Sequence, residues 1–558
     1  MPGTSFESHP ASPHSTGQHS HPSLGRSPLT SRRSLLAGGG LLGVAAATGL
    51  GIPAPPARAA PASAYESAAA YDYTSRETFD TFDRIFHEGG VSGQPDEPNE
   101  AGGLAWGQSY VLLGFLRMYE AYRDTYYLDR LITNVDLMLD QRDSVRGATD
   151  YRGRSLPAWR ATNPYTVGTV ELTDSAGHPV LEVRSARAYA DTTTGTVRAG
   201  SSADSFTLEV RNARYGYVDT FANLVMDPAS PDYAVRRVYD AYPTLTMTTA
   251  RDLRGAGDEG GLPAHGTFSF ASQPVIFAVH TGMITYPVAA YVRTVYDDPK
   301  LRKDPHYKGK ADEYLAAVTA AVTVHDDEWR ESDGLGYLQW PKGMPVPYDG
   351  TEQPVNQSTA LGQTYAELAA ATGSARYRSR TRAMARMVAT QLTVDSDQAY
   401  VWTYWPKFGV MYEGFAKTGS PDTDVSAYTP AYGSGGVGAQ QIEDLSHGAI
   451  SVEFAALAFR EKLAFDGSDM ARFARTYADN LATEADGVAT TFVRVDGSGA
   501  LATSGQYLQA PRWLPVVRWD DRIFPHCRAV YVDHDVQPGY GSGLAAIGYL
   551  NWAARGRT

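Results

Sequence analysis

Four stretches of the chain repeat one pattern: a polar opening, an apolar helix, a short turn and a second apolar helix. Apolar residues recur at three- and four-residue steps on both sides of each turn, which is typical of helices packed as antiparallel pairs. Such pairs bury their apolar faces only by stacking on further pairs, in an open solenoid or a closed ring. The openings are at Gln108, His280, Asn356 and His447, and each turn follows 16 to 19 residues later.

The polar openings stand at equivalent ends of successive helix pairs. In a closed double ring, the first helices of the pairs line the inside, and their N-terminal ends gather around one cavity. The four opening side chains would then share that cavity. The alternative is that they are four unrelated helix caps. A fifth opening, at residues 539–543, precedes a last apolar helix.

One opening holds more polar groups than a helix cap requires. Glu443, Asp444, Ser446 and His447 stand within five residues at the start of an apolar helix. One Asp would suffice as a cap, so the sequence predicts a functional site here. The alternative is structural, with Asp444 or Ser446 as the cap and His447 as a half-buried, hydrogen-bonded histidine.

The sequence between the first and second helix pairs has a different periodicity. Apolar and polar residues alternate there, with Gly, Asp and Thr clusters between the alternating runs, which indicates β-strands. We therefore expect a mainly α fold, an (α/α) toroid of stacked helical hairpins with a small β-rich insertion. The alternating runs are residues 167–172, 180–183 and 205–210. The toroid is expected at residues 60–164 and 271–558, and the insertion at residues 165–270.

The first 59 residues predict the compartment. Arg32 and Arg33 precede a mildly hydrophobic run rich in Gly and Ala, and an Ala-x-Ala site ends at Ala59. This is typical of a twin-arginine export signal cleaved after Ala59. A membrane anchor is the alternative, although such a glycine-rich run spans a bilayer poorly. The single cysteine, Cys527, excludes an intrachain disulfide. From the export signal we expect a secreted protein without a membrane anchor, and we expect it to be a monomer.

The charge and the aromatic residues bear on the partner. A net charge of −13 at pH 7 argues against nucleic acid and anionic membranes, because both need a basic face. Aromatic residues outside the helices, such as Trp402 and Tyr404, favour sugars, whose C–H faces stack on rings. The alternative is that these rings pack loops onto helices. We expect a polysaccharide or oligosaccharide partner, and neither a cofactor nor a metal, since no diagnostic ligand spacing is present.

Three motifs carry a resemblance to a known group of proteins. The helix openings Trp106–Gln108 and Asn356–Ser358 and the Glu-Asp-Leu-Ser-His-Gly motif at Glu443–Gly448 resemble those of (α/α)-toroid carbohydrate-active enzymes. That group includes six-hairpin glycosidases, toroid polysaccharide lyases and the helical domain of glucuronyl epimerases, and no single family is assigned. The resemblance covers residues 71–140 and 275–556. It implies a toroid fold and activity on polysaccharides.

The favoured reaction is elimination or C5 epimerisation at a uronate. It needs a base, a proton donor and groups that hold the carboxylate, and an imidazole near neutrality is a ready base. The candidate catalytic residues are His447, His280, Tyr404, Tyr432, Glu443 and Asp444. The candidate substrate-binding residues are Gln108, Trp106, Arg152, Arg154, Asn356, Gln357, Trp402 and Arg512.

Two alternatives remain. Inverting hydrolysis needs one protonated carboxyl group and one carboxylate that activates water. Glu443 or Asp444 would supply one of these, and a carboxylate at residues 326–328, which the register places at the far end of its hairpin, would supply the other. The second alternative is a secreted glycan-binding protein without catalysis. The Trp- and Arg-rich segment at residues 511–524 is expected to pack and close the ring, with a substrate-contacting wall as its alternative.

Overall fold

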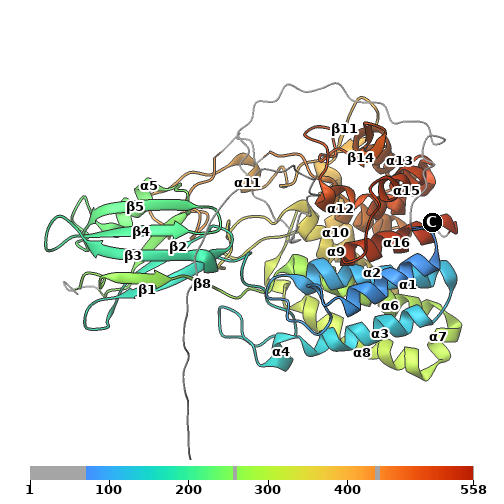
Figure 1. Ribbon diagram of the computed structural model, residues 1–558, viewed down its shortest axis with the longest axis horizontal. Helices are drawn as coiled ribbons and strands as arrows, with labels where there is room; N and C mark the ends of the chain where they lie inside the picture. The colour runs from blue at the N-terminus through green and yellow to red at the C-terminus, as the bar shows by residue number, and fades with distance from the viewer. Residues whose placement is uncertain (1–70, 256–260, 434–439, 557–558) are drawn as a thin grey trace, which may run out of the picture. The chain divides into compact units, whose positions relative to one another are not determined.

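The computed structural model describes residues 71–255, 261–433 and 440–556 (Figure 1). The fold is mixed: helices are accompanied by several small antiparallel sheets. The expected helix pairs are present, and strands are more numerous than the sequence indicated. The predicted export signal lies outside the described residues. In the described ranges, no helix is long and apolar enough to cross a membrane.

Each of the four predicted helix pairs is formed. The first helix of each pair is almost fully buried, and the second returns beside it with one face toward solvent. The four pairs are α2 (Ser109–Tyr122) with α3 (Tyr126–Asp140), α6 (Ala278–Asp297) with α8 (Pro305–Thr323), α9 (Val355–Thr372) with α10 (Ala375–Gln391), and α12 (Leu445–Arg460) with α13 (Gly467–Arg475).

Two further contacts involve the C-terminal part of the chain. The 3₁₀-helix η6 (Ala510–Trp519) packs against α15 (Ile523–Asp533), and α16 (Gly541–Ala554) packs against α1 (Arg76–Glu88). The Trp- and Arg-rich segment is thus largely η6, and its Trp513 is fully buried. The apolar residues of this segment are therefore packed in the core, which confirms the packing part of the favoured interpretation.

The first helices of successive pairs also contact one another. α2 contacts α6, α6 contacts α9, and α9 contacts α12. The segment η6 contacts both α12 and α16, and α16 contacts α2. The α6–α9 contact is especially close at Gly282, where the two backbones meet without an intervening side chain.

Two buried carboxylates lie among these helices. Glu453 on α12 accepts hydrogen bonds from Arg117 of α2, Tyr286 of α6 and Tyr549 of α16. Glu367 on α9 forms ion pairs with arginines of α6 and α12. Because charged hydrogen bonds of this kind are strong and directional, Glu453 ties together helices that are far apart in the sequence.

Short-range signals set several helix ends. Asp444 caps α12 by accepting hydrogen bonds from the N–H groups of its first turn. Asp466 and Asp469 form a reciprocal capping box at α13. Gly373 ends α9 with a φ of 68°, a left-handed conformation that favours glycine.

The β-rich insertion contains two four-stranded antiparallel sheets, in the orders β6-β2-β1-β8 and β5-β4-β3-β7. Alternate residues of both sheets contribute to one apolar core, which includes Leu181, Val197 and Leu208. Three of the strands, β1, β2 and β4, were expected from the alternation. The strands are β1 (Gly168–Thr173), β2 (Pro179–Ser185), β3 (Thr193–Ala199), β4 (Phe206–Asn212), β5 (Tyr217–Leu224), β6 (Thr248–Asp252), β7 (Gly266–Ser269) and β8 (Ala271–Ser272).

Short elements connect these parts, and the sequence did not predict them. The two-stranded hairpins are β9 (Trp329–Ser332) with β10 (Leu335–Leu338), β11 (Thr393–Val394) with β12 (Tyr400–Val401), and β13 (Ala482–Ala485) with β14 (Val488–Thr491). The short helices are η2 (Leu104–Gln108), α4 (Asp143–Arg146), η3 (Ala190–Thr192), α5 (Ala234–Ala241), α7 (Pro299–Lys303), η4 (Asp326–Glu328), α11 (Val410–Glu413), η5 (Thr476–Leu481) and α14 (Ser504–Tyr507).

We expect Gly282→Ala to destabilise the protein. A methyl group there would lie 2.4 Å from backbone atoms of Ala360 and Leu361. The two helices would have to move apart, at a cost of about 1 to 3 kcal/mol in the free energy of unfolding. Urea or thermal unfolding measures this cost. Gly309→Ala, in α8 where nothing lies within 4 Å, is the control and should leave stability unchanged or slightly raised; equal effects of the two would contradict the close contact.

Candidate functional site

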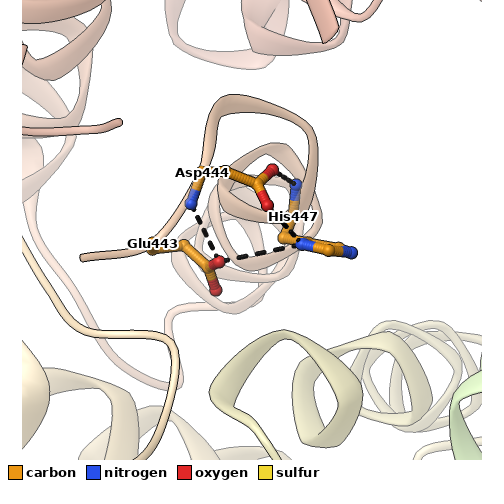
Figure 2. A group of neighbouring side chains, drawn as sticks. All are labelled: Glu443, Asp444 and His447. Carbon is orange, nitrogen blue, oxygen red and sulfur yellow. Dashed lines mark hydrogen bonds and ion pairs between the residues drawn. The ribbon is translucent and has the colours of Figure 1, made fainter. Parts of the chain in front are cut away.

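Glu443, Asp444 and His447 lie side by side at the N-terminal end of α12 (Figure 2). Asp444 Oδ1 accepts the N–H groups of Ser446 and His447 at 2.9 and 3.0 Å, and its Oδ2 lies 2.6 Å from His447 Nδ1. A Glu443 oxygen lies 3.9 Å from the same Nδ1. The imidazole keeps 20% exposure, and its Nε2 forms no hydrogen bond with the described residues. The ring is therefore held at one nitrogen and free at the other.

Glu443 is fully buried next to this pair. Its Oε1 accepts the N–H of Asp444 at 3.0 Å, and its Oε2 accepts the side-chain amide of Asn356 at 3.1 Å. Burial raises the pKa of Glu443 to about 8, and the Asp444 carboxylate adds to the rise while His447 opposes it. Glu443 is therefore mostly protonated at neutral pH.

Asp444 and His447 form a partly buried ion pair. Burial opposes the charge on both groups, but their mutual attraction outweighs it. The pKa of Asp444 consequently lies well below its usual range, and the pKa of His447 rises to about 9. The expectation that the pKa of His447 lies near neutral pH is thus wrong, because the Asp444 carboxylate stabilises the proton on the imidazole.

Tyr404 and Gln357 border the imidazole. The backbone N–H of Tyr404 donates to the Gln441 carbonyl oxygen at 2.9 Å, and its own carbonyl oxygen accepts the Val355 N–H at 3.0 Å. The centre of its ring lies 5.6 Å from that of His447. Gln357 is a hydrogen-bond partner of the Tyr404 hydroxyl, whose pKa burial raises well above its usual value. Both side chains are half-buried, so both reach solvent.

Arg512 adds positive charge to the site. Its guanidinium donates to the Ser446 carbonyl oxygen at 3.2 Å and lies 4.9 Å from the centre of the Tyr110 ring. Among the described residues, no carboxylate forms an ion pair with it. Since Glu443 is mostly protonated, His447 and Arg512 carry two positive charges against the single negative charge of Asp444. The site is therefore locally positive within an acidic protein.

His280 belongs to a separate, buried cluster at the N-terminal end of α6. Trp106 Nε1 donates to His280 Nε2 at 3.1 Å, and Asn99 Nδ2 lies 3.2 Å from Nδ1. The Tyr165 ring meets the imidazole edge-on, with centres 4.8 Å apart. Burial lowers the pKa of His280 to about 3. Contrary to the expectation, His280 is not available to a substrate as a base, because it is 1% exposed and both ring nitrogens have neighbours. Trp106 is likewise committed to His280.

Four of the expected substrate-binding residues are buried: Gln108, Asn356, Trp402 and Arg512, which is 5% exposed. The side-chain amide of Asn356 donates a hydrogen bond to Glu443, so Asn356 positions that carboxyl group. Trp402 is 1% exposed, and the loop residues Trp340 and Trp405 are each 5% exposed, so these rings pack the loops and cannot stack on a sugar. Gln108 is fully buried in the π-helix η2, and neither end of its amide has a partner in the described parts of the chain. The expectation of direct sugar contacts is corrected at these positions.

In the described ranges, no hydrogen bond, ion pair or ring contact joins Arg152, Arg154 or Tyr432 to Glu443, Asp444 or His447. Arg154 forms an ion pair within its own loop, and Arg152 lies over the ring of the preceding residue. Tyr432 meets the Tyr348 ring edge-on, with centres 5.2 Å apart. The structure therefore gathers Glu443, Asp444, His447 and their neighbours, and leaves these three elsewhere.

The carboxylates of residues 326–328 lie at the same end of the helix pair as the start of α6. Because α8 runs back along α6, His325 Nε2 comes to lie 2.8 Å from Thr281 Oγ1. Glu328 is buried and hydrogen-bonded to His325 and Gln353, and Asp326 pairs with two arginines of α10. The placement at the far end was therefore wrong. The carboxylate oxygens of Asp326 and Glu328 are already occupied, whereas Asp327 is exposed and its carboxylate forms no ion pair or hydrogen bond within the described residues.

The sequence reasoning did not identify Tyr110 or Gln506. Tyr110 lies beneath the Arg512 guanidinium, and Gln506 Oε1 accepts the Ser446 N–H at 3.2 Å. Tyr110 stands two residues after Gln108, in the first turn of the first predicted helix. Its position next to a predicted polar opening could therefore have identified it. Gln506 lies in α14, which the sequence did not predict.

The three grouped side chains offer ligand atoms that lie within 4.8 Å of one another. A cation could bind them only if Glu443 lost its proton and His447 Nδ1 gave up its hydrogen bond to Asp444. The present hydrogen bonds instead fit an acid–base site. Comparisons with protein-family models, with curated proteins and with solved structures found no match for this chain. The chemistry is therefore inferred from the geometry of these residues.

We expect Asp444→Asn to lower the pKa of His447 from about 9 to below 6.5. The substitution removes the carboxylate charge and leaves the burial, while the amide oxygen can still cap α12. NMR titration of the imidazole C–H signals measures the change. A His447 pKa that stays near 9 in the variant would show that another group holds the proton.

We expect Glu443→Gln to change the pH dependence of stability. The pKa of Glu443 is about 8 in the folded protein and 4.5 as its ordinary value, so the unfolded chain ionises first and folding becomes less favourable as pH rises from 4.5 to 8. The glutamine variant lacks this loss. It should match the parent near pH 4 and be more stable than the parent at pH 8. Urea unfolding across this range measures the difference, and parallel curves would contradict a raised pKa.

Proposed function

We propose that the chain is a secreted carbohydrate-active enzyme that acts on uronate-containing polysaccharides by β-elimination or C5 epimerisation. The observation that carries the proposal is the locally positive site at the start of α12. His447 and Arg512 outweigh Asp444 there, because burial keeps Glu443 neutral. With His447 protonated, this partly exposed site is locally positive in a chain with net charge −13, which favours the approach of a negatively charged substrate before His447 gives up its proton.

We also infer that the helix pairs close into an (α/α) toroid. The inner helices would be α2, α6, α9, α12, η6 and α16, since each contacts the next and α16 returns to α2. The shared hydrogen bonds of Glu453 to α2, α6 and α16 support the closure. The N-terminal ends of these helices, with His447 and Arg512 among their residues, would then surround one opening.

His447 is proposed as the base. Asp444 fixes the ring through Nδ1, which leaves Nε2 as the nitrogen that reaches solvent. After His447 has lost its proton, Nε2 takes the hydrogen at C5 of a uronate. The electron pair of that C–H bond forms the C4–C5 double bond, and the C4–O bond breaks with its electrons on oxygen. The Tyr404 hydroxyl gives its proton to this departing oxygen.

Gln357, which reaches solvent, is proposed to bind the uronate carboxylate, and the buried Arg512 to stabilise its charge from within the protein. Removal of the C5 hydrogen places negative charge on that carboxylate, and nearby positive charge and amide donors stabilise it. Arg512 supplies the charge, and Gln357 supplies an amide beside Tyr404. In epimerisation the same carbanion would take back a proton on the opposite face of the ring.

Inverting hydrolysis has weaker support. It requires a protonated carboxyl group that reaches the glycosidic oxygen. Glu443 is protonated at neutral pH, but it is fully buried and both of its oxygens accept hydrogen bonds. A binding protein without catalysis would have no need of a free imidazole nitrogen beside a buried acid.

A panel of acidic and neutral polysaccharides tests the reaction. Elimination produces the ultraviolet absorbance of an unsaturated uronate, and epimerisation exchanges the C5 hydrogen for solvent deuterium. Hydrolysis produces reducing ends without either signal. We expect one of the first two on acidic substrates only. Because only neutral His447 can take a proton, kcat/KM should rise about tenfold per pH unit up to about pH 9.

We expect His447→Ala and Tyr404→Phe each to lower kcat by about 100-fold or more, the usual contribution of a positioned acid or base. His178→Ala, at an exposed histidine of the β-rich insertion, is the control and should leave the rate unchanged. Circular dichroism confirms that each variant is folded. Full activity in His447→Ala would refute the assignment of the site.

A further inference from the structure

Three tyrosines and two arginines gather on the β-rich insertion and form what we call the tyrosine–arginine surface. The rings of Tyr215 and Tyr217 stack with centres 5.4 Å apart, and Tyr189 meets Tyr215 edge-on at 6.2 Å. The Arg214 guanidinium lies 4.6 Å from the centre of the Tyr189 ring, and that of Arg187 lies 5.2 Å from the centre of the Tyr217 ring. Tyr215 is 42% exposed, the most open of the three rings.

Buried hydrogen bonds hold this surface in place. Asn212, at the end of β4, is fully buried; its amide donates to Thr193 Oγ1 at 2.9 Å and to the Tyr189 carbonyl oxygen at 3.4 Å. Its Oδ1 accepts the Tyr215 N–H at 3.2 Å. One side chain thus fixes both segments that carry the exposed rings. A rigid surface binds a ligand with a smaller loss of conformational entropy than a mobile one.

The backbone at Tyr189 supports the same conclusion. Its φ is 61°, a left-handed conformation that is uncommon for a residue with a large side chain. Conformations of this kind cost free energy and persist where the surroundings impose them. The backbone at Tyr189 is therefore held in this conformation by its surroundings.

Neither arginine of this surface is neutralised. Among the described residues, Arg187 and Arg214 form no ion pair, whereas Arg184, Arg237 and Arg254 of the same insertion each pair with a carboxylate. Unpaired guanidinium groups on a protein with net charge −13 favour a ligand that carries negative charge. The planar guanidinium matches a carboxylate in particular, and exposed tyrosine rings suit the C–H faces of sugars.

We propose that the tyrosine–arginine surface is a second glycan-binding site, which takes sugar units that carry a carboxylate. The tyrosine rings would hold the sugar faces, and Arg187 and Arg214 would bind the carboxylates. The inference extends the proposed function, on which the choice of uronates rests, by assigning a place for parts of the polymer remote from the reaction.

The surface has a link to the N-terminal end of α6. The backbone N–H of Tyr189 donates to the carbonyl oxygen of Pro164, the residue before Tyr165, at 3.3 Å. Tyr165 in turn packs on His280, in the first turn of α6. A polymer bound at Tyr189 would therefore lie near the N-terminal end of α6.

Isothermal titration with hexasaccharides of galacturonic and glucuronic acid, and with their carboxyl-reduced counterparts, tests the proposal. The full chain carrying His447→Ala serves as the parent, so that turnover does not consume the probe. We expect Tyr215→Ala to weaken binding of both the acidic and the reduced probes about tenfold, through the lost ring face. Arg214→Ala should weaken only the acidic probes, by a similar factor, and Tyr215→Phe should bind like the parent.

Two matched controls separate this surface from general effects. Tyr126→Ala removes a tyrosine of similar exposure, 44%, and Arg236→Ala removes an exposed arginine that is already paired with Asp240. Both should bind like the parent. Thermal unfolding checks that every variant is folded.

The outcomes distinguish this inference from the proposed reaction. Parent-like binding by Tyr215→Ala and Arg214→Ala, or no binding of acidic hexasaccharides by the parent, overturns the second site even if the wild-type chain is an active enzyme. If Tyr215→Ala and Arg214→Ala lose binding while the wild-type chain is inactive on every uronate polymer, the second site is supported and the proposed reaction is refuted.

Discussion

One buried carboxylate joins helices that are hundreds of residues apart. Glu453 accepts hydrogen bonds from Arg117, Tyr286 and Tyr549, which come from three other helices. A charge in such a place is tolerated only when partners surround it, so each of the four helices depends on the other three for its position. The N-terminal ends of these helices carry or border the clusters around Glu443 and His280. The hydrogen bonds of Glu453 therefore also help to position those two clusters.

Burial, applied unequally, gives three neighbouring groups different protonation states. Glu443 has no positive partner at hydrogen-bond distance, so desolvation keeps it neutral, whereas Asp444 and His447 stabilise each other's charge. The result is a positive site built at the start of one helix. The tyrosine–arginine surface is also positive, but for a different reason: its two arginines lie over aromatic rings and are not paired with carboxylates in the described residues. Two distinct features thus favour the same kind of ligand.

Local patterns predicted the helix pairs and the cluster at Glu443, because periodicity and capping are properties of neighbouring residues. The same reasoning failed for His280 and Trp402, whose burial depends on partners from distant segments, such as Asn99 for His280. It also missed the tyrosine–arginine surface, since Tyr189 comes from a different segment than Tyr215 and Tyr217, and only the fold of the insertion brings the two segments together. Sequence spacing therefore indicated which residues could carry chemistry, while exposure had to come from tertiary structure.

The contact between α1 and α16 bears on how the protein is made. The side-chain amide of Asn551, in α16, donates to the backbone carbonyl oxygen of Tyr73, and the Tyr73 hydroxyl donates to the carbonyl oxygen of Val536. During translation, α1 can pair early with α3 through Tyr127 and Arg130, but its face toward α16 stays uncovered until the ribosome releases that helix. Contacts of such long sequence separation slow folding and leave apolar faces uncovered in the meantime. The nascent chain should consequently depend on chaperones until its last helix has emerged.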